Sequence, residues 1–153
     1  IQEQYLETVA AAADLAASAG VNILIEPINP INMPNYFLNS QAQAHAVLDF
    51  INRPNVKIQM DLFHCQRTEG NVSTKLAEYL PTGRVAHLQI AGAPDRHEPN
   101  TGELNYSFIF EQLLKLNYSG WIGCEYVPAG DTRSGLQWLQ AWREQERQLH
   151  MGS

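Results

Sequence analysis

The sequence is poor in the residues on which several classes of protein depend. Its two cysteines, Cys65 and Cys124, are too few for a disulfide-stabilised scaffold, so we expect a reducing, cytoplasmic compartment. Positive charge is scarce: 10 Lys and Arg against 16 Asp and Glu give a formal net charge of −6, which argues against nucleic acid as a partner. No apolar run approaches the roughly 18 residues of a membrane span, so no membrane partner is expected.

Short motifs of several common chemistries are missing as well. Neither Gly-x-Gly-x-x-Gly nor the Walker pattern occurs, which argues against dinucleotide and nucleotide sites. The Gly-x-Ser-x-Gly turn of serine hydrolases is absent, and no Cys or His pairs have zinc spacing. With 44% hydrophobic and 17% charged residues, the composition is that of a globular protein with an apolar core.

Both ends of the chain are atypical of a natural protein. The sequence opens at Ile1 within a helical pattern and without Met, which predicts that upstream residues are missing. The last four residues, 150–153, look like a cloning scar. We therefore assign residues 1–149 to one domain and leave 150–153 out of the fold.

Hydrophobic periodicity predicts one helix followed by four strand–helix units. The strand ends recur at intervals of roughly 30 residues or a little more, the length of one βα unit. Strands that alternate with helices predict a parallel sheet. Ser40 and Asn105 are predicted N-caps. The expected strands are 21–26, 56–62, 85–91 and 121–126, and the expected helices are 2–19, 40–52, 71–80, 105–117 and 134–148.

Alternation within these strands distinguishes two kinds of parallel sheet. One side of each strand is apolar, as a face covered by helices must be, and the other side is mixed. A doubly wound sheet buries both faces, whereas the mixed side suits the inside of a barrel. The pattern therefore favours an α/β fold of the TIM-barrel type, with four βα units forming half of a barrel. In the third strand the apolar side is Ala86, Leu88 and Ile90, and the mixed side is Val85, His87 and Gln89.

Each predicted strand ends in a side chain that offers an oxygen ligand: Glu26, Asp61, Gln89 and Glu125. Because the carboxyl ends of barrel strands form one face, these side chains are expected to point into a common volume. Three neighbouring carboxylates repel one another unless one binds a proton or all share a cation. An all-oxygen set suits Mg²⁺ or Mn²⁺. For any single member, capping of the following helix is the alternative interpretation.

Three basic side chains lie close to these strand ends. His64, in the loop after Asp61, is expected to bind a substrate oxygen or the metal, with a surface or helix-capping role as the alternative. Arg96, in the loop after Gln89, is placed to pair with a substrate carboxylate, or is a solvated loop residue. His87, one layer below Gln89, is expected either to orient the metal ligands or to be a hydrogen-bonded core histidine.

Five segments of the chain resemble hydroxypyruvate isomerases, a group of xylose isomerase-like TIM barrels that also includes 2-oxo-tetronate isomerases and has ketose 3-epimerases as cousins. The similarity extends from about Tyr5 to Arg143 and corresponds to the last four of eight barrel strands. It implies a metal held by the four strand-end residues, of which Gln89 is the hydroxypyruvate isomerase variant. The segments are 25–29, 59–64, 87–91, 96–103 and 123–126.

The same resemblance implies an activity and site roles. Glu26 and Glu125 would form the acid–base pair, and His64 and Arg96 would contact substrate oxygens. The expected reaction is metal-assisted proton transfer through an enediolate, from hydroxypyruvate to tartronate semialdehyde or from a 2-oxo-tetronate to its 3-oxo isomer. The alternatives are a ketose 3-epimerase, a metal-binding module without catalysis, and an inactive half-barrel fragment. Such a fragment has open sheet edges, through which two copies could close a barrel.

Overall fold

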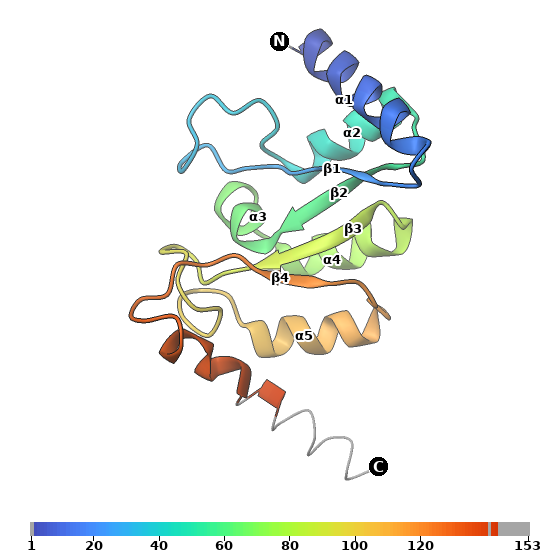
Figure 1. Ribbon diagram of the computed structural model, residues 1–153. Helices are drawn as coiled ribbons and strands as arrows, with labels where there is room; N and C mark the ends of the chain where they lie inside the picture. Colours follow the sequence, from blue (N-terminus) through green and yellow to red (C-terminus); the bar gives the residue numbers. More distant parts are fainter. Residues whose placement is uncertain (1, 141, 144–153) are drawn as a thin grey trace.

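A four-stranded parallel sheet forms the centre of the computed structural model, which describes residues 2–140 and 142–143 (Figure 1). The strands lie in the order β1-β2-β3-β4, with all three pairings parallel, as the alternation of strands and helices predicts. The elements are α1 (Gln2–Ala17), β1 (Ile23–Ile25), α2 (Gln41–Ile51), β2 (Val56–Asp61), α3 (Leu62–Thr68), α4 (Val72–Tyr79), η1 (Leu80–Thr82), β3 (Val85–Ile90), α5 (Tyr106–Lys115), β4 (Ile122–Cys124) and η2 (Ser134–Leu136).

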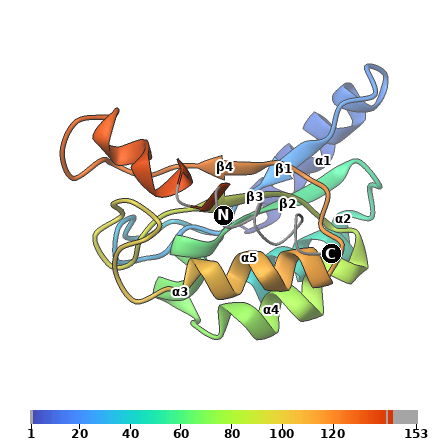
Figure 2. The same ribbon diagram turned by 90° about the horizontal axis from the view of Figure 1, so that it is seen from below.

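Helices α3, α4 and α5 lie together on one face of the sheet (Figure 2). The apolar side chains of the strands point towards this helical layer and form the core with it. The opposite face has no such cover in the described part of the chain: Leu24 is 39% exposed there and Trp121 is 84% exposed. A parallel sheet covered on one face only is what half of a barrel would present. Core residues include Ile25, Ile58, Met60, Leu88, Ile90, Leu76, Ile109 and Leu113.

Two helix starts confirm the predicted N-caps. The Ser40 side chain accepts a hydrogen bond of 3.2 Å from the backbone N–H of Gln43 at the start of α2. The Asn105 side chain accepts one of 3.2 Å from Phe108 at the start of α5. Each cap satisfies a backbone N–H that has no partner within the helix, and so fixes the residue at which the helix begins.

Helix α3 corrects the prediction that a loop follows the second strand. The apolar residues Leu62 and Phe63 suggested that the strand continued to residue 62, but the strand ends at Asp61 and the helix begins at once. Asp61 caps it by accepting a 2.8 Å hydrogen bond from the backbone N–H of Phe63. His64 therefore lies in the first turn of a helix, which gives it a fixed position.

The first residues of β3 correct a second prediction. Val85 is buried and Ala86 is exposed, the reverse of the expected faces. The cause is a register irregularity against β2, in which Ile58 pairs with Val85 while Gln59 pairs with His87. Ala86 is thus the extra residue of a β-bulge. From His87 onwards the predicted alternation holds, with Leu88 and Ile90 buried.

The segment after β4 differs from the expected regular helix 134–148. It begins as the 3-10 helix η2 and continues as helix over 137–140 and 142–143; the remainder of the prediction lies outside the described residues. Trp138 and Trp142 pack against Phe110 of α5. Cys124, in the outer strand β4, is exposed. Among the described residues, no helix has both the length and the apolar character to cross a membrane.

The two outer strands lead to a prediction about the solution state. In the described part of the chain, β1 and β4 each pair on one side only, and unpaired edges beside a face with exposed apolar side chains such as Leu24 and Trp121 favour association. We therefore expect light scattering to give a mass above the 17.2 kDa of one chain.

Two matched variants locate the contact. The Trp121→Glu exchange should shift the mass towards that of the monomer, because it places a charge on the open face. Phe50→Glu, at a residue 74% exposed on α2, is the control and should leave the mass unchanged. A parent chain that stays monomeric at every concentration would rule out this association.

Candidate metal and acid–base site

The four predicted oxygen ligands lie at the carboxyl ends of the four strands. Glu26 directly follows β1, Asp61 ends β2, Gln89 is the penultimate residue of β3 and Glu125 directly follows β4. The parallel register places Asp61 beside Gln89 and Gln89 beside Gly123. The predicted strand ends therefore meet along one edge of the sheet, as in the carboxyl face of a barrel.

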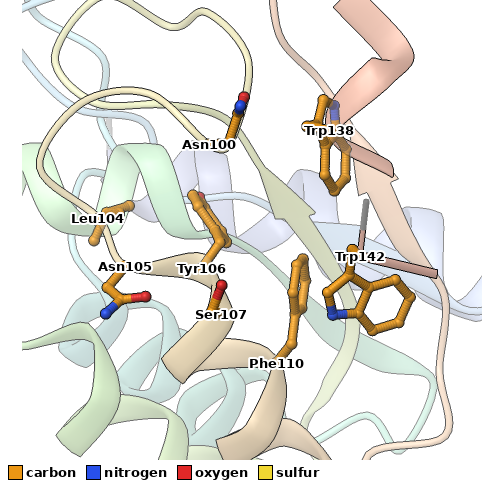
Figure 3. A pocket seen from close by; sticks show the side chains of 8 residues that line it. All are labelled: Asn100, Leu104, Asn105, Tyr106, Ser107, Phe110, Trp138 and Trp142. Atoms are coloured by element: carbon orange, nitrogen blue, oxygen red, sulfur yellow. The ribbon is translucent and has the colours of Figure 1, made fainter. Parts of the chain in front are cut away.

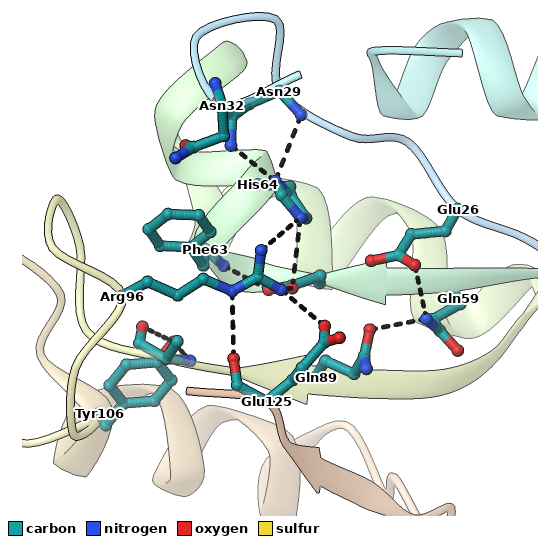
Figure 4. Close-up of polar contacts among 12 residues, drawn as sticks. Glu26, Asn29, Asn32, Gln59, Phe63, His64, Gln89, Arg96, Tyr106 and Glu125 are labelled. Atoms are coloured by element: carbon teal, nitrogen blue, oxygen red, sulfur yellow. Dashed lines mark hydrogen bonds and ion pairs between the residues drawn. The ribbon is translucent and has the colours of Figure 1, made fainter. Parts of the chain in front are cut away.

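Arg96 joins two of these carboxylates. Its Nη2 lies 2.6 Å from Oε2 of Glu125 and 3.2 Å from Oδ2 of Asp61, and its Nε donates to the backbone oxygen of Glu125 at 3.2 Å (Figure 4). Asp61 is completely buried, whereas the Glu125 side chain is 54% exposed. The guanidinium group thus supplies the positive charge that the buried Asp61 carboxylate requires.

Asp61 caps a helix and also faces the site, so its position is compatible with both roles considered for it, helix cap and metal ligand. Oδ1 caps α3 by accepting from Phe63, and Oδ2 faces Arg96 and the ring of His64. The cap fixes the carboxylate, so that its second oxygen is held towards the site. Capping and ligand binding are therefore compatible in one side chain, and the capping alternative does not exclude a role in the site.

The carboxyl groups of Glu26 and Asp61 hold their protons more tightly than ordinary ones. Burial, followed by the charges of Asp61 and Glu125, raises the pKa of Glu26 from 4.5 to about 7. Burial raises the pKa of Asp61 from 3.8 to about 6, although Arg96 acts in the opposite direction. A group with a pKa near 7 both accepts and returns protons readily at neutral pH, as an acid–base catalyst must.

The imidazole ring of His64 lies between Arg96 and the loop after β1. Its Nε2 is 3.2 Å from Nη1 of Arg96 and 3.8 Å from Oδ2 of Asp61, and its Nδ1 contacts Asn29. The side chain is 3% exposed, and burial together with the nearby cations Arg96 and Arg67 lowers its pKa from 6.5 to about 4. His64 is therefore neutral at physiological pH.

Gln59 is a member of the site that sequence reasoning missed. Its Nε2 donates to Oε2 of Glu26 at 2.7 Å and to Oε1 of Gln89 at 2.6 Å, and so joins two predicted metal ligands (Figure 4). Its position on the polar side of β2, two residues before Asp61, was the available signal. His87 has no hydrogen bond to these residues in the described part of the chain, so its orienting role stays a prediction.

Four of the predicted site residues border a hollow of about 260 Å³ at the carboxyl end of the sheet. The loop after β1 contributes Ile28, Asn32 and Met33 to its wall. The hollow has polar groups on one side and partly apolar side chains on the other, which suits a small polar molecule. Glu26, His64, Arg96 and Glu125 complete the lining.

The donor set fits a divalent cation. Ligand atoms of Glu26, Asp61 and His64 lie within 4.8 Å of one another. Two of these are buried or half-buried carboxylates with raised pKa values, which a cation would stabilise in their ionised form. The Gln89 amide oxygen, held by Gln59, and the Glu125 carboxylate extend the oxygen set that Mg²⁺ and Mn²⁺ prefer.

The loop that carries Arg96 is held by contacts with the segment after β4. The backbone oxygen of Arg96 accepts from Val127 at 2.8 Å, and the Glu98 side chain accepts from Ala129 at 3.1 Å. Arg96 has a φ of 58°, a left-handed conformation that is uncommon outside glycine and frequent at functional sites. The loop therefore fixes Arg96 in the orientation from which it reaches Glu125.

Gly102 closes this loop and allows a prediction of stability. Its φ is +86°, and a Cβ there would overlap the carbonyl oxygen of Ala93, which accepts from the next residue, Glu103, at 2.8 Å. We expect Gly102→Ala to lower the free energy of unfolding by about 2 kcal/mol, measured by urea denaturation. Gly70→Ala is the control, because its φ of +64° carries strain without any atom near the Cβ; about 1 kcal/mol is expected. Equal losses in the two variants would contradict the proposed overlap.

A second hollow, of about 370 Å³, lies between α5 and the segment after β4 (Figure 3). The aromatic rings of Tyr106, Phe110, Trp138 and Trp142 dominate its wall, and none of its lining residues carries a charge. The Tyr106 hydroxyl is already used, because it donates to the backbone oxygen of Ala91 at 2.8 Å. This hollow contains none of the predicted site residues.

Comparison with protein families places these observations in context. Residues 1–142 match the model of a family described as xylose isomerase-like TIM barrel. The 2-oxo-tetronate isomerase of Cupriavidus necator is 49% identical over 138 residues, which are 90% of this chain and 52% of that protein. The hydroxypyruvate isomerase of Escherichia coli is 37% identical over 94% of this chain and 55% of that protein. The chain thus spans about half the length of the curated relatives it matches.

Solved structures show the same relationship. A crystal structure described as AP endonuclease, family 2, from Brucella melitensis superimposes with a TM-score of 0.86 at 44% identity, over 92% of this chain and 54% of the other. The 3-keto-D-glucoside 4-epimerase of E. coli has a TM-score of 0.77 at 25% identity, over 89% of this chain and 52% of the other. The predicted half of a TIM barrel is therefore confirmed as the fold.

Proposed function

Because the chain belongs to the xylose isomerase-like TIM barrel family, we propose that it carries the metal-binding and acid–base half of an isomerase site for a small oxo acid. The observation that carries this proposal is the cluster of Glu26, Asp61 and Glu125, in which Arg96 contacts the last two and Glu26 has a pKa of about 7. The names of the most similar curated relatives support an isomerase of hydroxypyruvate or of a 2-oxo-tetronate.

In the proposed reaction, Glu26 removes a proton from the hydroxyl-bearing carbon next to the carbonyl group. Glu125 delivers a proton to the former carbonyl carbon, and the hydroxyl proton passes from the original hydroxyl oxygen to the former carbonyl oxygen, so that the carbonyl and hydroxyl groups exchange places. Proton exchange with solvent then returns Glu26 and Glu125 to their starting states. Arg96 and His64 hold substrate oxygens, and Gln59 keeps Glu26 and Gln89 aligned. Glu26, Asp61, Gln89 and Glu125 would hold the divalent cation. When bound, it supplies positive charge that stabilises the enediolate left by proton removal.

Proton exchange tests this proposal directly. Hydroxypyruvate incubated in D₂O with the chain and Mg²⁺ should acquire deuterium at its hydroxyl-bearing carbon, as followed by proton NMR. Calorimetry should show that Mn²⁺ binds the same chain. If Mn²⁺ binds but no deuterium is incorporated, the chain is a metal-binding module without catalysis and the proposed isomerase half-site is rejected. Faster exchange at carbon 3 of a ketose than of an oxo acid would favour the 3-epimerase alternative.

The raised pKa values predict a pH-dependent effect of the metal on stability. Glu26 and Asp61 bind protons more tightly in the folded chain, so their contribution to stability is present at low pH and is lost as the pH rises through about 6 and 7. A cation replaces those protons. We therefore expect Mn²⁺ to raise the melting temperature more at about pH 8 than at about pH 5.5.

The groups that face Glu26 make this prediction specific. Asp61 and Glu125 raise the pKa of Glu26, whereas Gln59 and Arg96 lower it. The difference between the two pH values should shrink in Glu26→Gln, which has no proton to exchange at that position. Equal shifts in the melting temperature of the parent chain at both pH values would contradict the raised pKa values.

A further inference from the structure

Asn29 is a buried residue for which the proposed reaction has no role. It lies in the loop after β1, is completely buried and contacts the ring of His64 (Figure 4). Its backbone N–H donates to Nδ1 of His64 at 3.2 Å, and its side-chain Nδ2 lies 2.6 Å from the same atom. Its Oδ1 accepts from the backbone N–H of Asn32 at 2.9 Å. Among the described residues, both polar contacts of Nδ1 of His64 thus come from Asn29.

We propose that Asn29 is a positioning residue that fixes the proton of His64 on Nε2. A backbone N–H can only donate, so Nδ1 must accept, and the single proton of the neutral ring then lies on Nε2. The part of this inference that assigns the Nε2 proton a role in substrate binding rests on the proposed function. The position of the proton itself depends only on the contacts of Asn29.

The opposite arrangement fits the contacts less well. If the Asn29 amide were turned over, its oxygen would accept from a proton on Nδ1. The backbone N–H of Asn29 would then face that proton, and the backbone N–H of Asn32 would face the turned NH₂ group. Two pairs of donors would oppose each other. With the proton on Nε2 there is one such pair, between Nε2 and Nη1 of Arg96 at 3.2 Å.

The two facing donors, Nε2 of His64 and Nη1 of Arg96, indicate which chemical group of a substrate would bind there. The Nε2–H group of His64 and the Nη1 of Arg96 converge, and Oδ2 of Asp61, at 3.8 Å from Nε2, is too far to accept a hydrogen bond from the ring. A substrate oxygen placed between them would accept from both, and a carboxylate oxygen best of all, because one donor is charged. The same proton removes the lone pair by which Nε2 would bind a metal. His64 is thereby a donor to substrate and not a further ligand beside Glu26, Asp61, Gln89 and Glu125.

Nitrogen NMR of histidine-labelled chain tests this without metal or substrate. Protonated and unprotonated ring nitrogens give well-separated ¹⁵N signals, and His64→Gln assigns the ring among the 5 histidines. We expect the proton of His64 on Nε2 in the parent chain, unchanged on addition of Mg²⁺. A proton on Nδ1 in the parent, or loss of the Nε2 proton when Mg²⁺ binds, would overturn the proposal.

Two exchanges at position 29 separate positioning from folding. Asn29→Ala keeps the backbone N–H and should keep the proton on Nε2. Asn29→Asp places a carboxylate against Nδ1 and should move a proton onto that atom, with oxo-acid binding weakened about tenfold. An Asn29→Asp chain that folds, as shown by circular dichroism, yet keeps the parent signals would also overturn the proposal. Because the tautomer is read without turnover, an absence of isomerase activity would reject the proposed function alone.

Discussion

Replacing Glu26 by glutamine should abolish tight Mn²⁺ binding and lower any proton-transfer rate by about 1,000-fold. The exchange preserves the size of the side chain, and its oxygen can still accept from Gln59. It removes the negative charge that binds the cation and the group whose pKa of about 7 suits proton transfer. Calorimetry with Mn²⁺ and deuterium exchange into hydroxypyruvate measure the two effects separately.

The matched control for this exchange is Glu111→Gln. Glu111 lies exposed on α5, outside the site, so metal affinity and exchange should both equal those of the parent chain. Asp61→Asn should resemble Glu26→Gln in metal binding while keeping the cap of α3, because an asparagine oxygen can still accept from the backbone N–H of Phe63. A Glu26→Gln chain that binds Mn²⁺ as tightly as the parent would remove Glu26 from the metal site.

Exchanging Arg96 for alanine should move two affinities in opposite directions. The guanidinium group contacts Asp61 and Glu125, which are the groups that a metal would bind, so the two cations compete for the same charge. Removing one should tighten Mn²⁺ binding by about tenfold, equivalent to roughly 1.4 kcal/mol. The same exchange removes a charged donor for the substrate carboxylate and should weaken oxo-acid binding by about 100-fold.

Two further variants make this result interpretable. Arg53→Ala removes an exposed arginine that pairs with Asp14 of α1, and should change neither affinity. Arg96→Lys keeps the charge without the fork of donors; it should restore the parent's metal affinity but only part of the substrate affinity. If both affinities fell together in Arg96→Ala, Arg96 would serve to maintain the loop and would not compete with the metal.

Much of this site could be predicted from the sequence because it depends on the regular alternation of side chains along strands. Side chains alternate along a strand, so Glu26, Asp61, Gln89 and Glu125 could be placed on one face from their positions alone. Parallel strands then bring their carboxyl ends together. The predicted alternation of strands and helices, the single sheet and the two N-caps are confirmed for the same reason: each depends on local pattern.

What the sequence does not reveal depends on contacts between distant segments. Gln59 is one of several polar residues on its face, and only the pairing of three strands shows that it joins Glu26 to Gln89. The left-handed conformation of Arg96 depends on its loop packing against the segment after β4. Helix α3 was hidden by Leu62 and Phe63, whose apolar character continues that of the strand before it.

The bulge at Ala86 also has a consequence for how much length variation this fold tolerates. Gln89 takes its direction from the regular pairing of residues 87–89 with residues 59–61, which begins after the extra residue. The turn before β3 lies on the other side of the irregularity. One residue added to that turn, or removed from it, can therefore be absorbed at the bulge without rotating Gln89. The bulge therefore allows the turn before β3 to change in length while Gln89 keeps its orientation in the site.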